Sequence, residues 1–456
     1  MHPFLVRKCL FPLQEFLKGK RTYKRLKELE QSQWLSTKAI EEIQFRHLKE
    51  HLEFAYHQVP YYKQLLNEHD LQPSRINSFS DFARIPFMSK DTLRNQFERL
   101  QPISKPSRVQ RISTGGSTGA PVTVLVDAER TAFTDACRMR SHHWYGVDVG
   151  SREIVLWGSP IELTKQDRIR VIRDRLMNSR LLSAFDMGEE SLARYADAID
   201  DYRPEKLYGY ASAIFLLAAY MSKSGRHPRV PPKVVFVTAE PLFDFQRKTI
   251  EEVFQCPVSI EYGARDAGLI ALECPSGGLH IPAEGMIVEI DGAGSERSGE
   301  IVITNLYSIA MPIIRYRTGD VGEMDQTPCS CSRGLPRLKR VEGRQTDFLV
   351  TEDGRLVHAL AIIYVLREIP AIRAFQVTQE SISRLVIHLV PEGSISASDR
   401  QTIQAKAKRL LGHEVEIVIQ EVSSIPLAAS GKFRYVISHV AESYLKNDPA
   451  LGYNHG

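Results

Sequence analysis

The stretch Ser113-Thr114-Gly115-Gly116-Ser117-Thr118-Gly119-Ala120-Pro121 carries the strongest local signal in this sequence. Its glycines allow backbone N–H groups to turn inward, and its hydroxyls add further donors, which together make a cradle suited to phosphate oxygens. It is not a P-loop, because no lysine follows Gly119, and it lacks the glycine spacing of a dinucleotide-binding turn. Taken alone, the stretch fits a Ser/Gly-rich surface linker as well as a phosphate-binding loop.

The composition is that of a globular protein. At about 150 residues per domain, 456 residues make about three units, or one large core with an appendix. Hydrophobic residues are 43% and charged residues 25%, which argues against disordered and fibrous classes. The net charge of +4 is small and dispersed over the chain, so we expect neither nucleic-acid binding nor a charged membrane-binding surface.

The sequence also argues against export and membrane insertion. No apolar run approaches the length of a transmembrane helix, so no membrane insertion is expected. The apolar start, Met1–Leu13, is interrupted by Arg7, Lys8 and Pro12, which is untypical of a secretory signal. Six cysteines do not make a disulfide framework in a chain of this length, and they favour a reducing, cytoplasmic location.

Apolar periodicity predicts an α/β body. Residues 1–100 are expected to be helical, with two helices in Thr37–Leu66 because Pro60 interrupts the pattern. Short apolar runs predict strands at Ile154–Trp157, Val234–Val237, Met286–Ile290 and Ile301–Thr304. Amphipathic stretches predict helices at Leu192–Tyr202, Ser212–Ser222 and Phe245–Phe254. This alternation indicates a large, partly parallel sheet flanked by helices.

The pattern changes near residue 344, where we expect a second domain to begin. Strands are predicted at Phe348–Val350, Arg373–Val377, Ser383–Leu389 and Val415–Ile419, and helices at Ala359–Arg367 and Ser398–Leu411. We therefore expect a large domain over 1–344 and a small α+β domain over 345–456, joined near Glu342–Asp347.

Four further motifs follow the glycine-rich stretch: Tyr262-Gly263-Ala264-Arg265-Asp266, Tyr316-Arg317-Thr318-Gly319-Asp320, Gly343-Arg344-Gln345-Thr346-Asp347 and Ser430-Gly431-Lys432. In this order and spacing the motifs resemble the adenylate-forming superfamily of acyl-CoA synthetases, luciferases and peptide-synthetase adenylation domains. Within it, the sequence is most similar to phenylacetate–coenzyme A ligases and the related ligases of capsular polysaccharide biosynthesis. The resemblance implies a large adenylate-forming domain with mixed β-sheets and flanking helices, followed by a small mobile α+β domain.

The resemblance also implies how ATP would be held. The β- and γ-phosphates would be bound by Ser113, Thr114, Gly115, Gly116, Ser117, Thr118 and Gly119. Many relatives carry a lysine where this chain has Ala120 or Val122, so a metal or another cation would have to neutralise more of the charge. The adenosine would be held by Ala239, Glu240, Pro241, Tyr262, Gly263, Asp320 and Arg344, with Tyr262 stacking on adenine and Asp320 accepting from the ribose hydroxyls.

Two catalytic residues and a hinge are implied in the same way. Lys432 would bridge the substrate carboxylate and the α-phosphate, and Asp347 would be the hinge about which the small domain rotates. Asp266 stands where the family carries a glutamate and would hold Mg²⁺; its alternative is to cap a following helix. The segment Tyr208, Gly209 and Tyr210 would line the acyl pocket, although aromatic residues are as often plain core.

Cys274, His280, Cys329 and Cys331 form a candidate structural zinc site. Two cysteines one residue apart can chelate one ion, and Gly277-Gly278 allow Cys274 and His280 to fold onto a common point; the alternative is a set of ordinary reduced thiols. Cys9, Cys137 and Cys256 are interpreted as packing residues. His142 and His143 are adjacent, so they point to different faces of a helix and are not expected to act as a catalytic pair.

The leading functional interpretation is an ATP- and Mg²⁺-dependent ligase. It would convert an aryl or related carboxylic acid to acyl-AMP with release of pyrophosphate, and then transfer the acyl group to coenzyme A. One alternative acceptor is an amine or a sugar amino group in polysaccharide or natural-product biosynthesis. A second alternative is a nucleotide-binding regulator that has lost turnover. The expected partners are small molecules, and the expected state is a monomer or homodimer.

Overall fold

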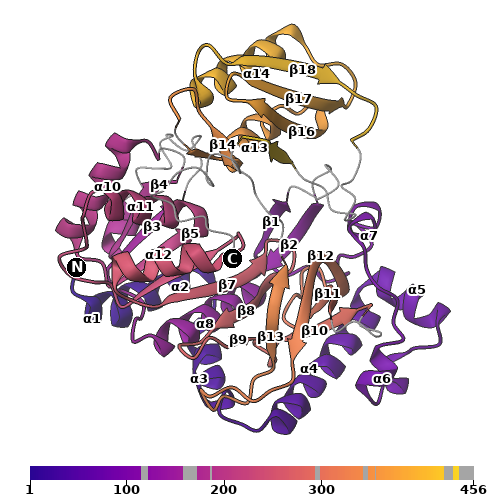
Figure 1. The fold of residues 1–456 in the computed structure, drawn as a ribbon. Helices are drawn as coiled ribbons and strands as arrows, with labels where there is room; N and C mark the ends of the chain where they lie inside the picture. Colours follow the sequence, from indigo (N-terminus) through magenta and orange to yellow (C-terminus); the bar gives the residue numbers. More distant parts are fainter. Residues whose placement is uncertain are drawn as a thin grey trace.

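The computed structural model describes residues 1–114, 122–157, 172–184, 187–292, 298–342, 348–354, 356–425 and 435–440. Figure 1 shows a large body below and a small C-terminal body, in gold, above it. The large body contains an 11-stranded sheet in the order β10-β11-β12-β13-β9-β8-β7-β6-β5-β3-β4, and the small body contains a four-stranded sheet in the order β18-β17-β16-β19. This is the α/β architecture with an added α+β unit that the sequence predicts.

The N-terminal hundred residues are helical, as predicted. The elements are α1 (Pro3–Leu5), a π-helical turn η1 (Val6–Leu10), α2 (Phe11–Lys18), α3 (Thr22–Ser32), α4 (Thr37–Gln58), α5 (Pro60–Glu68), a 3₁₀ turn η2 (Pro73–Arg75), α6 (Phe79–Phe82) and α7 (Lys90–Asn95). Pro60 is the first residue of α5, which confirms the predicted break. Helix α4 buries Leu48 and Leu52 completely, and each such side chain contributes about 1.5–3 kcal/mol of transfer free energy.

A β-hairpin leads from these helices into the main sheet. Strands β1 (Val109–Thr114) and β2 (Val122–Asp127) pair antiparallel, with Thr114 opposite Val122. Asp127 then caps α8 (Ala128–Trp144), because its Oδ1 accepts the N–H of Arg130 at 2.9 Å. Its Oδ2 accepts the N–H groups of Ile309 and Ala310 at 2.8 and 2.7 Å, which fastens the hairpin to the body.

One half of the main sheet is parallel. Its strands are β3 (Glu153–Trp157), β4 (Ser179–Ser183), β5 (Lys206–Tyr210), β6 (Val234–Thr238) and β7 (Val258–Ala264). Helices α10 (Glu189–Tyr202), α11 (Ala211–Lys223) and α12 (Asp244–Phe254) lie between these strands in the chain, as predicted. The carboxyl ends of parallel strands share one edge, which is where ligands bind in open α/β sheets.

The other half of the sheet is antiparallel. It consists of β8 (Gly268–Glu273), β9 (Leu279–His280), β10 (Met286–Asp291), β11 (Ser298–Asn305), β12 (Ile313–Asp325) and β13 (Arg337–Glu342). The hairpin β1–β2 packs on the same core as this half, since Val122, Val124 and Val126 share a cluster with Ile270 and Tyr316.

The small body has its own hydrophobic core and its own sheet. Its elements are β14 (Phe348–Val350), β15 (Leu356–His358), α13 (Leu360–Arg367), β16 (Ile372–Ser381), β17 (Arg384–Pro391), α14 (Ala397–Leu411), β18 (Glu416–Glu421) and β19 (Val436–Ser438). Every predicted element of this region is present. The fully buried Gln379 ties two parts together: its amide pairs with the backbone of Val350 in β14, at 2.9 and 2.6 Å, and accepts from Ser438 Oγ in β19 at 2.9 Å.

The packing role predicted for the remaining cysteines is wrong for one of them. Cys137 and Cys256 are buried, but Cys9 is exposed on the N-terminal helical segment. The prediction failed because the periodicity there does not reveal which face of the segment meets the body. Among the described helices, none is long and apolar enough to span a bilayer.

Candidate active site

Two of the sequence motifs meet through their side chains. The Tyr262 hydroxyl, at the end of β7, donates to Asp320 Oδ2 in β12 at 3.0 Å. Strands β8, β9 and β13 lie between β7 and β12 in the sheet order, so a flat sheet would hold the two backbones roughly 19 Å apart. The contact therefore requires a strongly coiled sheet that turns β12 toward the carboxyl end of β7.

Asp320 is presented by an irregularity in its strand. The pairing of β11 with β12 shifts register between Glu300 and Val302, so Thr318, Gly319 and Asp320 leave the regular ladder. Gly319 has φ of 84°, in the left-handed region that glycine tolerates. Thr318 Oγ1 donates to the Ile301 carbonyl and accepts the Asp320 N–H, at 2.8 and 3.1 Å. The Thr-Gly-Asp part of the motif thus builds the bulge that turns the carboxylate out of the ladder.

Asp266 belongs to the same motif as Tyr262 and lies close to this contact. It is 7% exposed, in the turn between β7 and β8, so the alternative that it caps a following helix is wrong, because a strand follows. Its Oδ2 accepts the Tyr316 hydroxyl at 2.6 Å, and Arg130 donates to its carbonyl oxygen at 2.8 Å. Tyr316 belongs to the same motif as Asp320, so two separate hydrogen bonds join the Tyr262–Asp266 motif to the Tyr316–Asp320 motif.

The predicted adenine-binding turn follows β6 at the same edge. Ala239 has φ of 68°, an uncommon conformation for a residue with a Cβ, which marks a strained turn. Glu240 Oε2 accepts the N–H of Ser212 at 3.0 Å at the start of α11, so this carboxylate also holds a helix end. Thr238 Oγ1 donates to the Glu261 carbonyl at 2.8 Å, which ties the turn to Tyr262 through its neighbour.

The predicted acyl-pocket segment forms part of an aromatic group. Tyr210 is 2% exposed and stacks on Trp157 at 4.1 Å between ring centroids, while Tyr208 lies 6.2 Å from the same indole. A side chain at Gly209 would meet the Leu156 carbonyl oxygen at 2.5 Å, so glycine is needed where β5 passes β3. Trp157, at the carboxyl end of β3, is a residue that the sequence interpretation missed.

Behind these tyrosines lies a buried network of charges that the sequence interpretation also missed. Glu261 Oε2 accepts from Arg138 Nε at 2.9 Å and from the Tyr208 hydroxyl at 3.2 Å, and His142 lies 3.2 Å from Oε1. Burial by itself would raise the pKa of Glu261, but the Arg138 charge and the His142 hydrogen bond outweigh it and lower that pKa to about 2. The network fixes the residue that immediately precedes Tyr262.

The two adjacent histidines lie in different environments, as predicted for neighbours on one helix. His142 is buried, and burial together with the Lys206 charge lowers its pKa to about 4. His143 is partly exposed between Asp148 and Glu30, at 2.9 and 2.5 Å, and its hydrogen bond to Asp148 raises its pKa.

The four predicted metal ligands converge. One ligand atom from each of Cys274, His280, Cys329 and Cys331 lies within 4.8 Å of every other. Cys274 Sγ and Cys329 Sγ are 3.7 Å apart, far too long for a disulfide and close to the ~3.8 Å edge of a tetrahedron with zinc–sulfur bonds of about 2.3 Å. His280 Nε2 lies 3.2 Å from Cys331 Sγ.

The surroundings of this cluster suit a metal. His280 Nδ1 lies 3.1 Å from the Leu335 carbonyl, which fixes the proton there and leaves Nε2 as an electron-pair donor toward the sulfurs. A Cβ at Gly278 would lie 2.7 Å from Cys329 Sγ, so this glycine lets the two loops close. Burial raises the pKa of the Cys274 thiol to about 12, so without a metal this thiol keeps its proton at neutral pH. A metal ion that bound the sulfur would displace that proton, which makes metal binding depend on pH.

Several predicted residues lie outside the described part of the chain: Gly115, Gly116, Ser117, Thr118, Gly119, Arg344, Asp347 and Lys432. Their anchors are described. Ser113 Oγ lies 3.1 Å from Thr123 Oγ1 across the hairpin, so the strands on both sides of the glycine-rich stretch are paired up to Thr114 and Val122. Strand β14 begins directly after the predicted hinge, and β19 begins four residues after Lys432.

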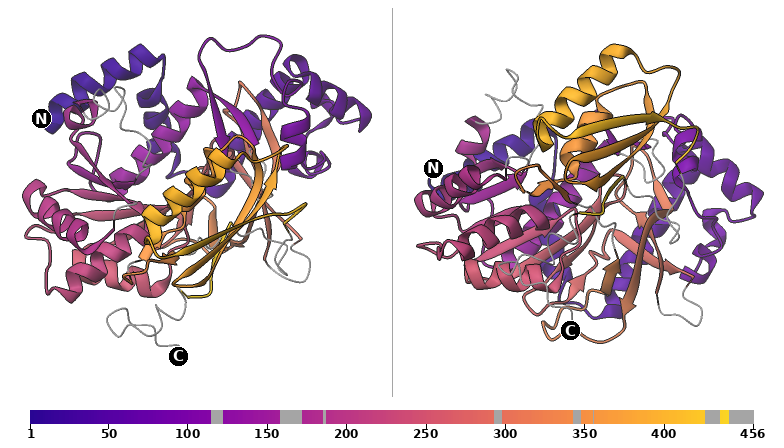
Figure 2. Two further views of the ribbon diagram at one scale, coloured as in Figure 1. Left: turned by 90° about the horizontal axis from the view of Figure 1, so that it is seen from above. Right: turned by 45° about the horizontal axis from the view of Figure 1, so that its top comes forward.

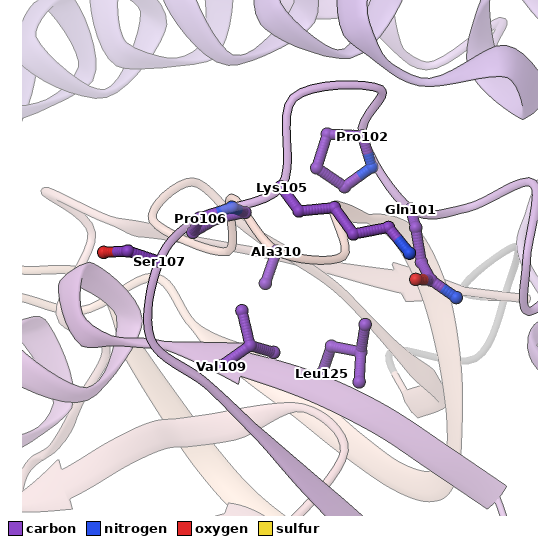
Figure 3. A pocket seen from close by; sticks show the side chains of 8 residues that line it. All are labelled: Gln101, Pro102, Lys105, Pro106, Ser107, Val109, Leu125 and Ala310. Carbon is purple, nitrogen blue, oxygen red and sulfur yellow. The ribbon is translucent and has the colours of Figure 1, made fainter.

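A cavity of about 300 Å³ lies at the base of the hairpin, beside the start of β1. Figure 3 shows Lys105, Val109 and Leu125 facing it, with Ala310 behind. None of its lining residues is a predicted site residue, so this cavity is separate from the contact between Tyr262 and Asp320.

Comparisons with known proteins find relatives along most of the chain. A CapK C-terminal domain is matched over residues 349–439. Protein CapK of Staphylococcus aureus is 25% identical over 430 residues, covering 91% of each chain. The phenylacetate–coenzyme A ligase of Thermus thermophilus is 25% identical over 362 residues, covering 74% of this chain and 77% of that one.

Solved structures show the same fold. One of them is a structure of 2-hydroxyisobutyryl-CoA ligase in complex with 2-HIB-AMP and CoA, in the thioesterification state. It superposes with a TM-score of 0.59 at 20% sequence identity, covering 90% of this chain and 92% of that one. An open conformation of the same ligase, with 2-HIB-AMP and CoA, superposes with a TM-score of 0.55, covering 86% of this chain and 90% of that one. The chain is therefore a homologue of CapK and of the phenylacetate–coenzyme A ligases, and its fold is that of the adenylate-forming superfamily.

Proposed function

We propose that this adenylate-forming ligase activates a flat, aryl or related carboxylic acid with ATP and passes the acyl group to coenzyme A. The homology to phenylacetate–coenzyme A ligases supports acyl-CoA ligase activity in general. The observation that carries the proposal here is the contact of Tyr262 with Asp320 at the carboxyl edge of the parallel strands, beside the Ala239–Pro241 turn.

Adenosine fits this arrangement chemically. The Tyr262 ring offers a stacking surface, and Asp320, held by the Tyr262 hydroxyl, has acceptor capacity for the two ribose O–H groups. The strained turn at Ala239 follows β6, and the adenine base would bind beside it, between the ends of β6 and β7. The paired ends of β1 and β2 would hold the glycine-rich stretch against the β- and γ-phosphates.

The reaction would proceed in two displacements. A carboxylate oxygen of the acid attacks the α-phosphorus, the bond to the bridging oxygen breaks, and pyrophosphate leaves with those electrons. The thiolate of coenzyme A then attacks the acyl carbon and AMP leaves. Lys432 and Arg344 would neutralise charge at the α-phosphate during the first step, where two anions must meet. Mg²⁺ would supply further neutralisation of the phosphates, with Asp266 as its proposed carboxylate ligand.

The aromatic group supports the choice of acid. Trp157 and Tyr208 are partly exposed at the same end of the sheet as Tyr262, and the Tyr208 hydroxyl is engaged by Glu261. Tyr210 covers one face of Trp157 and Arg138 lies over the Tyr208 ring, so the remaining exposed ring surface would contact a ligand, and it favours flat apolar groups.

The cysteine–histidine cluster is proposed to hold a structural zinc ion. Four protein ligands leave no open coordination position, so the ion would clip the loop between β8 and β9 to the loop before β13, without taking part in the chemistry.

Pyrophosphate release with a panel of aryl, fatty, amino and sugar acids tests the proposal, in the presence and absence of coenzyme A and of simple amines. We expect acid-dependent release, with multiple turnovers when coenzyme A is present. Asp320→Asn should reduce release on the order of 10- to 100-fold, because a charged hydrogen-bond acceptor for ribose is lost. The matched control is Asp201→Asn, an exposed carboxylate on α10, which should match the wild type.

Three results would change the conclusion. If multiple turnovers require an amine and do not depend on coenzyme A, the acyl acceptor is an amine and not the thiol of coenzyme A. Release by Lys432→Ala at the wild-type rate would remove the role of that lysine. ATP binding with no release for any acid, under conditions where the protein is folded, would favour a nucleotide-binding regulator.

A further inference from the structure

The N-terminal helical segment α1–η1–α2 has an apolar face that no described part of the chain covers. The exposed fractions are 52% for Phe4, 48% for Leu5, 55% for Leu13, 81% for Phe16 and 64% for Leu17. Isolated exposed apolar residues are ordinary, but a contiguous set of large ones marks an interaction surface. Figures 1 and 2 place this indigo segment at the periphery of the large body, away from the small body.

The π-helical turn at Val6–Leu10 gathers these side chains on one side. In a regular α-helix of about 100° per residue, Leu13 would lie about 180° around the axis from Phe4. The extra residue of a π turn takes about 100° out of that rotation, which brings Leu13 to about 80° and Phe16 to about 20° from Phe4. The buried Val6 and Glu15 then fall on the other side, toward the body.

Positive charge is concentrated in this N-terminal segment. The first 21 residues contain five basic residues and one acidic residue, so their net charge is 5 − 1 = +4, equal to that of the whole chain. The exposed members are Lys8, Lys18 and Arg21. The small net charge of the protein therefore conceals a local excess, and the view of a dispersed charge does not hold here.

A second segment extends the same surface. Residues 172–176 are helical and expose Ile172 and Leu176, at 60% and 41%. Asn178, two residues after this helix, accepts from the amino group of Met1 at 2.7 Å and donates to the Met1 carbonyl at 2.9 Å, so the two segments lie side by side. We call the combination of these two segments the N-terminal surface.

We propose that the N-terminal surface docks on a lipid bilayer that contains anionic phospholipids. Large apolar side chains on a convex helix, flanked by lysine and arginine, match the boundary between headgroups and acyl chains, and the cations match lipid phosphates. Attachment would be peripheral, since no described helix can span the bilayer. It would hold the ligase at the membrane, with the small body and the nucleotide edge facing away from the N-terminal surface.

Two other occupants fit less well. A second copy of this chain would bring the same cations face to face across a two-fold axis, which opposes association. A peptide partner usually seats its own apolar residues in a groove, whereas here the apolar residues project from a helix.

The proposal is tested with the full chain by co-sedimentation with vesicles of phosphatidylcholine, alone or mixed with phosphatidylglycerol. We expect binding to the mixed vesicles and little to phosphatidylcholine alone, with binding weakened by salt. The variant Lys8→Gln/Lys18→Gln/Arg21→Gln should bind on the order of 100-fold more weakly, at about fivefold per cation. The variant Phe16→Ser/Leu17→Ser should bind at least about 10-fold more weakly, because two apolar side chains no longer insert.

Matched controls separate this surface from general charge and hydrophobicity. Ile103→Ser removes an equally exposed apolar side chain elsewhere, and Lys38→Gln/Lys63→Gln/Arg84→Gln removes the same number of charges elsewhere. Both should bind within about twofold of the wild type. Circular dichroism melting, expected to be unchanged for these exposed positions, verifies folding.

The proposal would be overturned if the wild type did not bind anionic vesicles, or if the control variants lost as much vesicle binding as the test variants. It would also be overturned if the protein formed a dimer in solution that Phe16→Ser/Leu17→Ser dissociates and did not bind vesicles. The last outcome would assign the surface to a second copy of the chain.

Discussion

Replacing Tyr262 with Phe should weaken nucleotide binding by acting through Asp320. The substitution keeps the ring that would stack on adenine and removes only the hydroxyl that donates to Asp320 Oδ2 at 3.0 Å. Without that donor, the carboxylate loses one of the contacts that orient it toward the position in which it would accept from the ribose hydroxyls. The expected effect is therefore on binding of ATP, with a much smaller effect on the rate of the chemical step.

The size of the effect follows from the exposure of the pair. A hydrogen bond to a charged group contributes about 1.5–3 kcal/mol when buried. Asp320 is only partly buried, so solvent screening reduces this to roughly 1 kcal/mol, or about a fivefold increase in Kd for ATP. Tyr56→Phe, which removes a hydroxyl paired with Asn67 on the exposed side of α4, serves as the matched control and should leave Kd unchanged.

A double-mutant cycle decides whether the hydroxyl acts through Asp320. Kd for ATP is measured by calorimetry for the wild type, Tyr262→Phe, Asp320→Asn and the double variant. If the hydroxyl works by orienting the carboxylate, Tyr262→Phe adds less than about twofold once Asp320 is already replaced. A full fivefold loss in that background would show that the hydroxyl contacts the nucleotide directly, and an unchanged Kd in the single variant would refute the reasoning altogether.

Two further predictions concern the metal site and acid stability. Elemental analysis of the purified protein should find about one zinc per chain. The variant Cys329→Ser should contain less than about a tenth of that and melt at a temperature several degrees lower, whereas the exposed Cys9→Ser should keep the zinc content and the melting temperature of the wild type. Equal zinc content in the two variants would contradict the site. Burial lowers the pKa of His51 to about 4 from 6.5, so below pH 6.5 the unfolded chain takes up a proton that the folded one refuses. The free energy of unfolding should therefore fall between about pH 6.5 and 4, by up to about 1.4 kcal/mol per pH unit for this residue. His51→Gln should flatten that fall in urea titrations and leave the part due to His142 and, in metal-free protein, to His280. An unaltered slope would show that His51 does not titrate as described.

Most of the secondary structure could be predicted because its signals are local. The break at Pro60, the β-branched run of β6 and the alternation along β17 each depend on neighbours within a few residues. Strand β12 was not predicted at its full length, because the polar bulge at Thr318–Asp320 interrupts the ladder without ending the strand, which continues to Asp325.

The candidate site was only partly predictable because it depends on the coil of the sheet. Nothing local in the sequence places Tyr262 against Asp320, and only the resemblance to a family suggested that they meet. The network around Glu261 had a usable signal that was overlooked. Glu261 lies inside an apolar strand, and a buried carboxylate there needs a cationic partner, which proved to be the partly exposed Arg138. The alternative that Asp266 caps a helix was wrong because a turn to another strand looks, in sequence, like a turn to a helix.

Gln379 connects the two ends of the small body that lead back to the active site. Its single amide grips β14, which emerges from the predicted hinge, and β19, which emerges from the segment carrying Lys432. The two described ends of the small body are therefore held together, and β14 and β19 should move as one unit. If the small body rotates about the predicted hinge, β19 would follow β14 without any change in the contacts between them.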